Sequence, residues 1–165
     1  MRTSTTLMLT IFAGCTGSNG QISNLLGGNA GIEIIHNPAR VEAFRIGPPE
    51  PPTLDFIHWP VQSGPLVLDA IQTAEAASLI LAGTSYDEWH SETGCGPQPG
   101  LKLMFIQHEQ SRTLIFCFEC DEVYAYDGSQ KIGLSNIAPA HDHFLKFFIK
   151  MFPADKQLTT LLHTR

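Results

Sequence analysis

The stretch between residues 101 and 134 constrains the fold more than any other part of this chain. Runs of four to six residues, bounded by turn residues and rich in β-branched and aromatic side chains, predict strands. The second run is apolar on both faces, which predicts a central strand. Because Asp127-Gly128 favours a tight hairpin turn, the runs predict an antiparallel meander. The four runs are Leu101–Ile106, Thr113–Phe118, Val123–Tyr126 and Lys131–Leu134.

Helical patterns flank this meander. Between Pro65 and Gly83, apolar residues recur at helical spacing, with a proline at the start and a glycine at the end. A second helix is predicted from about Ala140 to Met151, where four large apolar residues form one face. Phe152-Pro153 then breaks the pattern, and a last short helix follows.

The segments before the first helix are predicted as strands and a loop. Ile32–Ile35 and Arg40–Ile46 have strand character, and the prolines within 47–52 predict an extended connector. Strands in a block, with helices before and after them, are typical of α+β proteins. We therefore expect an antiparallel sheet meander packed by a helix before it and two helices after it.

The N-terminus has the pattern of an export signal. Arg2 supplies a positive charge, an apolar stretch covers residues 7–12, and small residues precede Cys15. This order is typical of a secretory signal peptide, and the stretch is too short to span a bilayer. Phe12-Ala13-Gly14-Cys15 resembles the bacterial lipobox, although Phe12 stands in place of the usual leucine. The alternative is an N-terminal strand with a buried cysteine.

The lipobox resemblance implies how the chain is divided and where it resides. Residues 1–14 would form the signal peptide, and Cys15 would be lipid-modified as the first mature residue. Glycines and asparagines within 15–31 predict a flexible tether, which leaves 32–165 as a single α+β domain. The protein is then exported and lipid-anchored to a bacterial membrane, on the outer membrane or the periplasmic face if the cell is Gram-negative.

The charge balance restricts the class of partner. Acidic residues outnumber basic ones by 16 to 10, and the lysines and arginines are scattered. Nucleic-acid binding proteins concentrate positive charge in a patch, so nucleic acid is not an expected partner. We expect the membrane, through the lipid anchor, and an envelope protein as partners.

Three further cysteines, Cys95, Cys117 and Cys120, are the main candidates for chemistry. In an exported protein the default is a structural disulfide, here from Cys95 to Cys117 or to Cys120. A bridge between Cys117 and Cys120 requires a turn, because residues three apart in a strand are about 10 Å apart at Cα. Any single bridge leaves one cysteine over.

Two other chemistries use the same cysteines. Thiol redox chemistry favours a helix N-terminus, whereas Cys117-x-x-Cys120 ends a predicted strand and precedes the acidic pair Asp121-Glu122, which would raise a thiol pKa. Zinc is the alternative cofactor, held by Cys95, Cys117 and Cys120 with His90 or His108, but a second closely spaced ligand pair is missing. Haem attachment is excluded because Asp121 stands where a histidine is required.

The histidines do not complete a hydrolytic motif. His141 and His143 are two residues apart, so on a helix they would point in different directions. No nucleophile accompanies them in a known hydrolase pattern, and no phosphate or dinucleotide loop is present. The sequence therefore favours a protein that is not an enzyme and needs no cofactor.

Three stretches resemble a group of uncharacterised bacterial exported lipoproteins that share C-G/F-x-P-G, CFxCD and FPxD patterns. The resemblance covers about the last two thirds of the chain and implies a common domain without a known activity. We therefore expect a membrane-tethered binding or envelope-structural domain, with a thiol-redox or zinc-binding protein as the alternative. The stretches are Cys95-Gly96-x-Gln98-Pro99-Gly100, Leu114–Asp121 and Lys146–Asp155.

Overall fold

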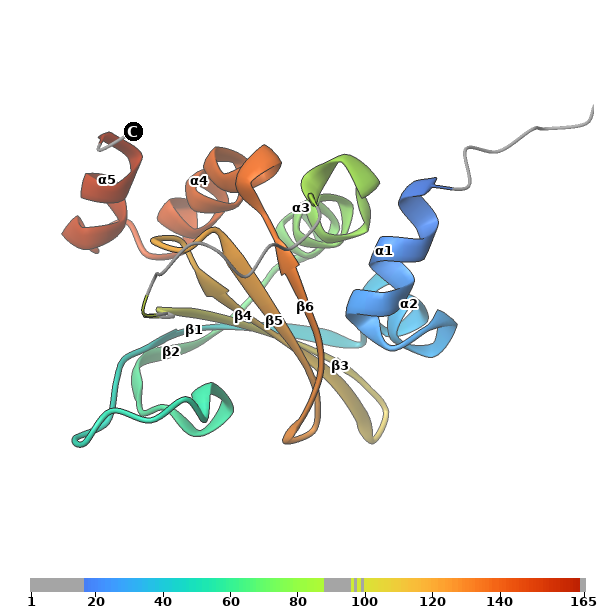
Figure 1. Ribbon diagram of the computed structural model, residues 1–165, viewed down its shortest axis with the longest axis horizontal. Coiled ribbons are helices and arrows are strands. Elements are labelled where there is room, and N and C mark those ends of the chain that lie inside the picture. The colour runs from blue at the N-terminus through green and yellow to red at the C-terminus, as the bar shows by residue number, and fades with distance from the viewer. Residues whose placement is uncertain (1–16, 88–95, 97, 99, 164–165) are drawn as a thin grey trace, which may run out of the picture.

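A six-stranded antiparallel sheet forms the centre of the domain (Figure 1), with the strand order β2-β1-β3-β4-β5-β6. The computed structural model describes residues 17–87, 96, 98 and 100–163. The sheet and its flanking helices confirm the predicted α+β fold class. The strands of the sheet are β1 (Arg40–Ile46), β2 (Val61–Val67), β3 (Leu101–Gln107), β4 (Gln110–Cys117), β5 (Glu122–Asp127) and β6 (Gln130–Asn136).

Helices cover one face of this sheet, and the segment 47–60 lies against the other (Figure 1). Two helices precede the first strand, one follows β2, and two close the described chain. The α-helices are α1 (Gly17–Leu26), α2 (Asn29–His36), α3 (Ala70–Leu81), α4 (His141–Met151) and α5 (Lys156–His163), and the short 3-10 turns are η1 (Phe56–His58), η2 (Gly83–Ser85) and η4 (Ala138–Ala140).

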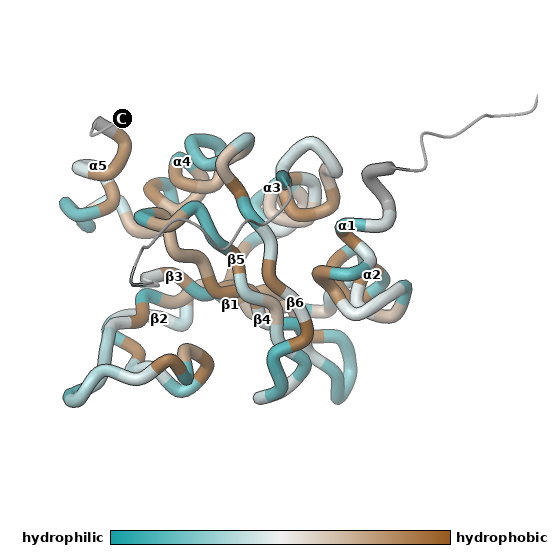
Figure 2. The backbone as a smooth tube through the Cα atoms, viewed as in Figure 1, coloured by the Kyte–Doolittle hydropathy of each residue, from teal (hydrophilic) through white to brown (hydrophobic). Residues whose placement is uncertain are grey.

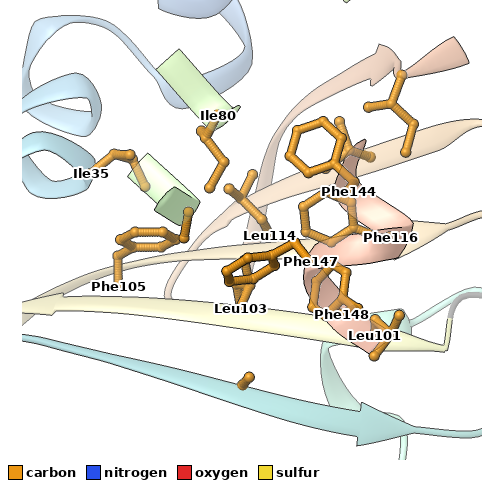
Figure 3. Close-up of a cluster of buried hydrophobic side chains, with 14 of the residues drawn as sticks. Ile35, Ile80, Leu101, Leu103, Phe105, Leu114, Phe116, Phe144, Phe147 and Phe148 are labelled. Carbon is orange, nitrogen blue, oxygen red and sulfur yellow. The ribbon is translucent and has the colours of Figure 1, made fainter. Parts of the chain in front are cut away.

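The main core lies between the sheet and the helices (Figure 3). Alternate residues of β3 and β4 point to this side, where aromatic rings from α4 pack on them. Phe116 lies 5.2 Å from Phe144 and 5.1 Å from Phe148 between ring centroids. The apolar colour in Figure 2 runs along the strands and the inner sides of the helices. Burial of these apolar side chains is the main contribution to the stability of the folded domain.

A second, smaller core lies on the opposite face of the sheet. We call these residues the outer-face cluster; they come from the strands, from the β4–β5 turn and from the 47–60 segment that lies over the sheet. The sheet is therefore buried on both faces around β4, as its two-sided apolar sequence predicts. The members are Phe44, Ile46, Phe56, Trp59, Ile115, Cys117, Cys120, Tyr124 and Tyr126.

One buried arginine connects the sheet to the last helix. The Arg45 guanidinium donates hydrogen bonds to the Asp155 carboxylate, to the Gly100 carbonyl and, at 3.1 Å, to Gln157 Oε1. Asp155 also accepts the backbone N–H groups of Gln157 and Leu158, so it caps α5. Its side chain is 19% exposed, and that of Arg45 is 10% exposed. This network fixes the position of α5 relative to β1.

The predicted meander and the closing helices are confirmed, with ends shifted by one to three residues. The helix expected from Pro65 begins later, at Ala70, because the Asp69 side chain accepts the Gln72 N–H and the Gln72 side chain accepts the Asp69 N–H. This reciprocal cap fixes the helix start. Pro65 instead lies in β2, a strand that the pattern did not predict.

The strand predicted at Ile32–Ile35 is wrong, since these residues belong to α2. The buried residues of α2 are Gly31, Ile34 and Ile35, which share one face of a helix at intervals of three and four. Tertiary packing of this face outweighs the strand preference of the isoleucines.

The flexible tether predicted for 15–31 is wrong from Gly17 onward. Residues 17–26 form α1, whose Ile22, Leu25 and Leu26 are buried in the main core. Glycine permits this packing on β6, since a side chain at Gly133 would overlap the Leu25 carbonyl. Within the segment itself, a side chain at Gly31 would likewise overlap the Leu26 carbonyl. Cys15 and the signal peptide proposed for 1–14 lie outside the described residues.

Two alanine substitutions distinguish a packed α1 from a tether. We expect Gly133→Ala to lower the free energy of unfolding by about 1–3 kcal/mol, because the added methyl group collides with the α1 backbone. Gly20→Ala should raise it by up to about 1 kcal/mol, because Gly20 is exposed in α1 and has free space around it. Urea unfolding measures both free energies. If neither substitution changed the free energy of unfolding, α1 would not pack on the sheet.

Candidate functional site

The predicted cysteine pair lies at the β4–β5 hairpin. Cys117 is the last residue of β4 and pairs with Glu122, and the four residues between them form the turn. Asp121 adopts a left-handed backbone, with φ of 55°, which completes the reversal. The turn that a bridge between Cys117 and Cys120 requires is therefore present, yet Cys117 is a free, buried thiol.

The surroundings of Cys117 do not activate its sulfur. Burial raises the pKa of the Cys117 thiol, and the acidic residues Glu122 and Glu119 act in the same direction. Backbone N–H groups of Gln98 and Cys120 oppose this shift, the former at 3.3 Å from Sγ, but burial dominates. A reactive thiol requires the opposite balance. This environment is typical of a structural cysteine.

The zinc site proposed for Cys95, Cys117, Cys120 and His90 is covered by the structure only in part. Cys95 and His90 lie outside the described residues. Among the residues that are described, no three histidine, cysteine or carboxylate side chains gather in a way that would hold a metal ion. The cysteine-zinc site therefore stays a prediction. His108, the other histidine considered, lies at the turn between β3 and β4, where it is exposed.

A cavity of about 330 Å³ opens beside the cysteine hairpin, between the 47–60 segment and the chain at Gly96 and Gln98. Its lining is mainly apolar. Gln98 connects the cavity to the cysteine hairpin, because it lines the cavity while its backbone N–H donates to Cys117 Sγ. Leu54 lies at the cavity with 78% of its surface exposed. The lining residues are Pro48, Pro52, Thr53, Leu54, Trp59, Gly96 and Gln98.

Aromatic packing holds the outer wall of this cavity on the sheet. Phe56 meets Trp59 edge-on at 5.2 Å and Tyr124 at 4.9 Å. The Trp59 indole N–H donates to the Thr53 carbonyl at 3.0 Å, and the Gly47 N–H donates to the Pro60 carbonyl at 3.1 Å. The segment 47–60 is thus a closed loop with its own buried contacts, which is the usual condition for a preformed binding site.

Polar groups beneath the loop are already engaged with one another. The Tyr124 hydroxyl donates to the Glu122 carboxylate, and both side chains are buried. Burial raises the pKa of Tyr124, and the bond to Glu122 raises it further. Burial likewise raises the pKa of Tyr126. Groups that hold their protons this firmly are poor acid–base catalysts near neutral pH.

His141 and His143 of α4 lie on different sides of the helix, as their spacing predicts. His141 is buried, whereas His143 is exposed. His141 Nδ1 lies 2.6 Å from the Asp121 carboxylate, while its Nε2 is buried without a hydrogen-bond partner. The ring packs edge-on against Phe118 at 5.2 Å. His141 therefore links α4 to the cysteine hairpin and presents no nitrogen to solvent.

The sequence missed the cavity because its lining residues are typical of a connector. Prolines in 47–52 suggest only an extended path. The available signal was the pair Phe56 and Trp59, two large aromatic residues placed directly after a proline-rich loop. Such residues need a surface on which to pack, and the second face of the sheet provides it.

Comparison with known protein families, curated proteins and solved structures finds no match to this chain. Among the described helices, none is both long enough and apolar enough to cross a membrane. The candidate site must therefore be judged on its own geometry. That geometry combines an apolar cavity with the buried side chains of Cys117 and Tyr124, whose pKa values are both raised by burial.

The raised pKa of Cys117 predicts slow alkylation. At about pH 8, iodoacetamide should modify Cys117 in the folded protein far more slowly than in urea, because burial disfavours the thiolate. The folded state holds this proton more tightly than the unfolded chain does. Unfolding therefore releases a proton above about pH 8.5, and stability should fall as pH rises through that range. Mass spectrometry of alkylated peptides measures the rate; equal rates in both states would contradict the assignment.

Proposed function

We propose that the protein is an exported, lipid-anchored domain that binds an apolar group of a partner and catalyses no reaction. The observation that carries this proposal is the cavity of about 330 Å³, lined by prolines, Leu54 and Trp59. Binding sites for small apolar groups are concave, mostly apolar and largely preformed. The cavity has all three properties, since its wall is fixed by aromatic contacts and closed loop hydrogen bonds.

Support for binding rather than catalysis comes from the titratable groups around the cavity. The pKa values of Cys117 and Tyr124 are both raised by burial, which favours their neutral forms. Neither group is therefore prepared to act as a nucleophile or a base near neutral pH. The partner that we propose is an envelope protein that inserts an apolar side chain or a short apolar segment.

The cysteines fit a structural role in this proposal, which includes a disulfide between Cys95 and Cys120. Cys117 carries a free thiol, so Cys120 is the described cysteine that remains for a bridge. Such a bond would close a loop of about 25 residues and contribute about 3 kcal/mol. It would also hold the chain near Gly96, which lines the cavity. A thiol-redox or zinc role for the three cysteines is the second candidate, and it rests on their spacing alone.

Lipid attachment at Cys15 is tested in a bacterial host that modifies lipoproteins. We expect an alkyne analogue of palmitate to label the wild-type protein, and intact mass to match residues 15–165 plus acyl chains. Cys15→Ala should abolish the label and leave the precursor uncleaved, whereas Cys117→Ala should keep the label. A wild-type mass that begins at Met1 without acyl chains would contradict export by this route.

Occupation of the cavity is tested with Nile red, a neutral apolar dye. Leu54→Asp should weaken binding of the dye roughly five- to ten-fold, because a charge at the cavity opposes entry of an apolar group. Ile71→Asp is the matched control, since Ile71 is 80% exposed on α3 and does not line the cavity. Fluorescence titration measures both affinities. Equal weakening by the two variants, or by neither, would show that the dye binds elsewhere.

A further inference from the structure

We propose that the lipid anchor holds the domain directly on the bilayer, with the beginning of α1 as the membrane-facing end. This inference rests on the proposed function, because it requires acyl chains on Cys15. It concerns a surface and a partner that the anchor alone does not specify. With a flexible tether the domain would move freely; without one, the fold itself decides which end meets the lipid.

The length of chain between the anchor and the fold is the first step. Thr16 is the one residue between Cys15 and Gly17, where α1 begins. Two successive Cα–Cα steps reach at most about 7.6 Å. An acylated cysteine therefore lies within one side-chain length of the helix start. The hydrocarbon chains of the anchor must enter the bilayer from that point.

The second step is that α1 is fixed to the rest of the domain. Leu25 and Leu26 are 2% and 0% exposed, and both belong to the main core. Near the start of α1, Gln21 Nε2 donates to the Asp87 carbonyl at 2.7 Å and to Ser135 Oγ at 3.3 Å. The helix cannot swing away from the sheet without losing these contacts. The anchor and the sheet are therefore mechanically coupled.

The third step gives the orientation, because α1 runs antiparallel to β6. Gln21 meets Ser135 near the end of β6, Leu25 meets Gly133, and Gly27 meets Ile132 toward its beginning. The β5–β6 turn, which contains Gly128, thus lies at the far end. The path along β6 from Gln130 to Ser135 covers about 17 Å. One end of the strand faces the membrane, and the turn points away from it.

The same orientation directs the cavity into the aqueous space. Figure 1 shows the start of α1 and the 47–60 segment at opposite sides of the molecule. A domain that rests on the membrane through the α1 end therefore presents Leu54 and the cavity to partners beyond the membrane surface. The membrane-facing end, which we call the anchor end, includes Gly20, Asp87 and Asn136, together with Thr84 of the η2 turn that contacts α1.

The experiment measures how close two exposed sites lie to lipid headgroups. The acylated protein is reconstituted into phosphatidylcholine vesicles that contain a lipid with a nitroxide on its headgroup. A genetically encoded azide residue replaces either Thr84, at the anchor end, or Ser129, at the β5–β6 turn, and carries the same fluorophore; both positions are exposed. We expect at least two-fold stronger quenching at Thr84 than at Ser129.

A linker variant provides the matched control. Insertion of about twenty glycine and serine residues between Thr16 and Gly17 adds roughly 25 Å of average reach, so the difference in quenching should disappear. Equal quenching at the two sites in the acylated wild-type protein, or stronger quenching at Ser129, would overturn this inference and leave the proposed function standing. Absence of acyl chains from the purified protein would overturn both.

Discussion

The ion pair between Arg45 and Asp155 is the contact on which the arrangement of the domain depends. Both side chains are largely buried, and each guanidinium nitrogen donates a hydrogen bond, to a carboxylate, a backbone carbonyl and an amide oxygen respectively. Removal of one partner from a buried pair costs about 3–5 kcal/mol, because the other charge is left without compensation. For a domain whose net stability is about 5–15 kcal/mol, that loss is severe.

The partners of Arg45 come from distant parts of the chain. Gly100 directly precedes β3, and a side chain there would overlap the Arg45 guanidinium in its present position. Asp155 follows the proline that ends α4 and caps α5 at the same time. The chain just before β3 and the connection between α4 and α5 therefore supply contacts to one arginine of β1.

How far the sequence predicted the structure depended on whether the signal was local. The meander from Leu101 to Asn136 was predictable because each strand is bounded by its own turn residues and its partner follows directly. The strand β2 was not predictable, because Gly64 and Pro65 interrupt it and because its partner in the sheet, β1, lies across the proline-rich segment.

The same distinction applies to the candidate site. Cys117 and Cys120 are visible in the sequence as a spaced pair, and the turn between them was an explicit requirement. Their burial in the outer-face cluster was not visible, because this cluster includes residues of a loop that begins 70 residues before Cys117 and packs on the far face of the sheet. The spacing of the cysteines suggested a redox or metal site. The packing of distant segments around Cys117 raises its pKa, which favours a structural role for this cysteine.

Close packing of α1 makes the segment that follows Cys15 part of the folded domain. A tether that plays no part in the fold can lengthen or shorten without effect on the core. Here the segment after Cys15 contributes buried leucines to the core and touches β6 through a glycine. A change in α1 would therefore alter the free energy of folding and, on the lipid attachment that we propose at Cys15, the geometry of the anchor. Selection on either property constrains the same ten residues, Gly17–Leu26.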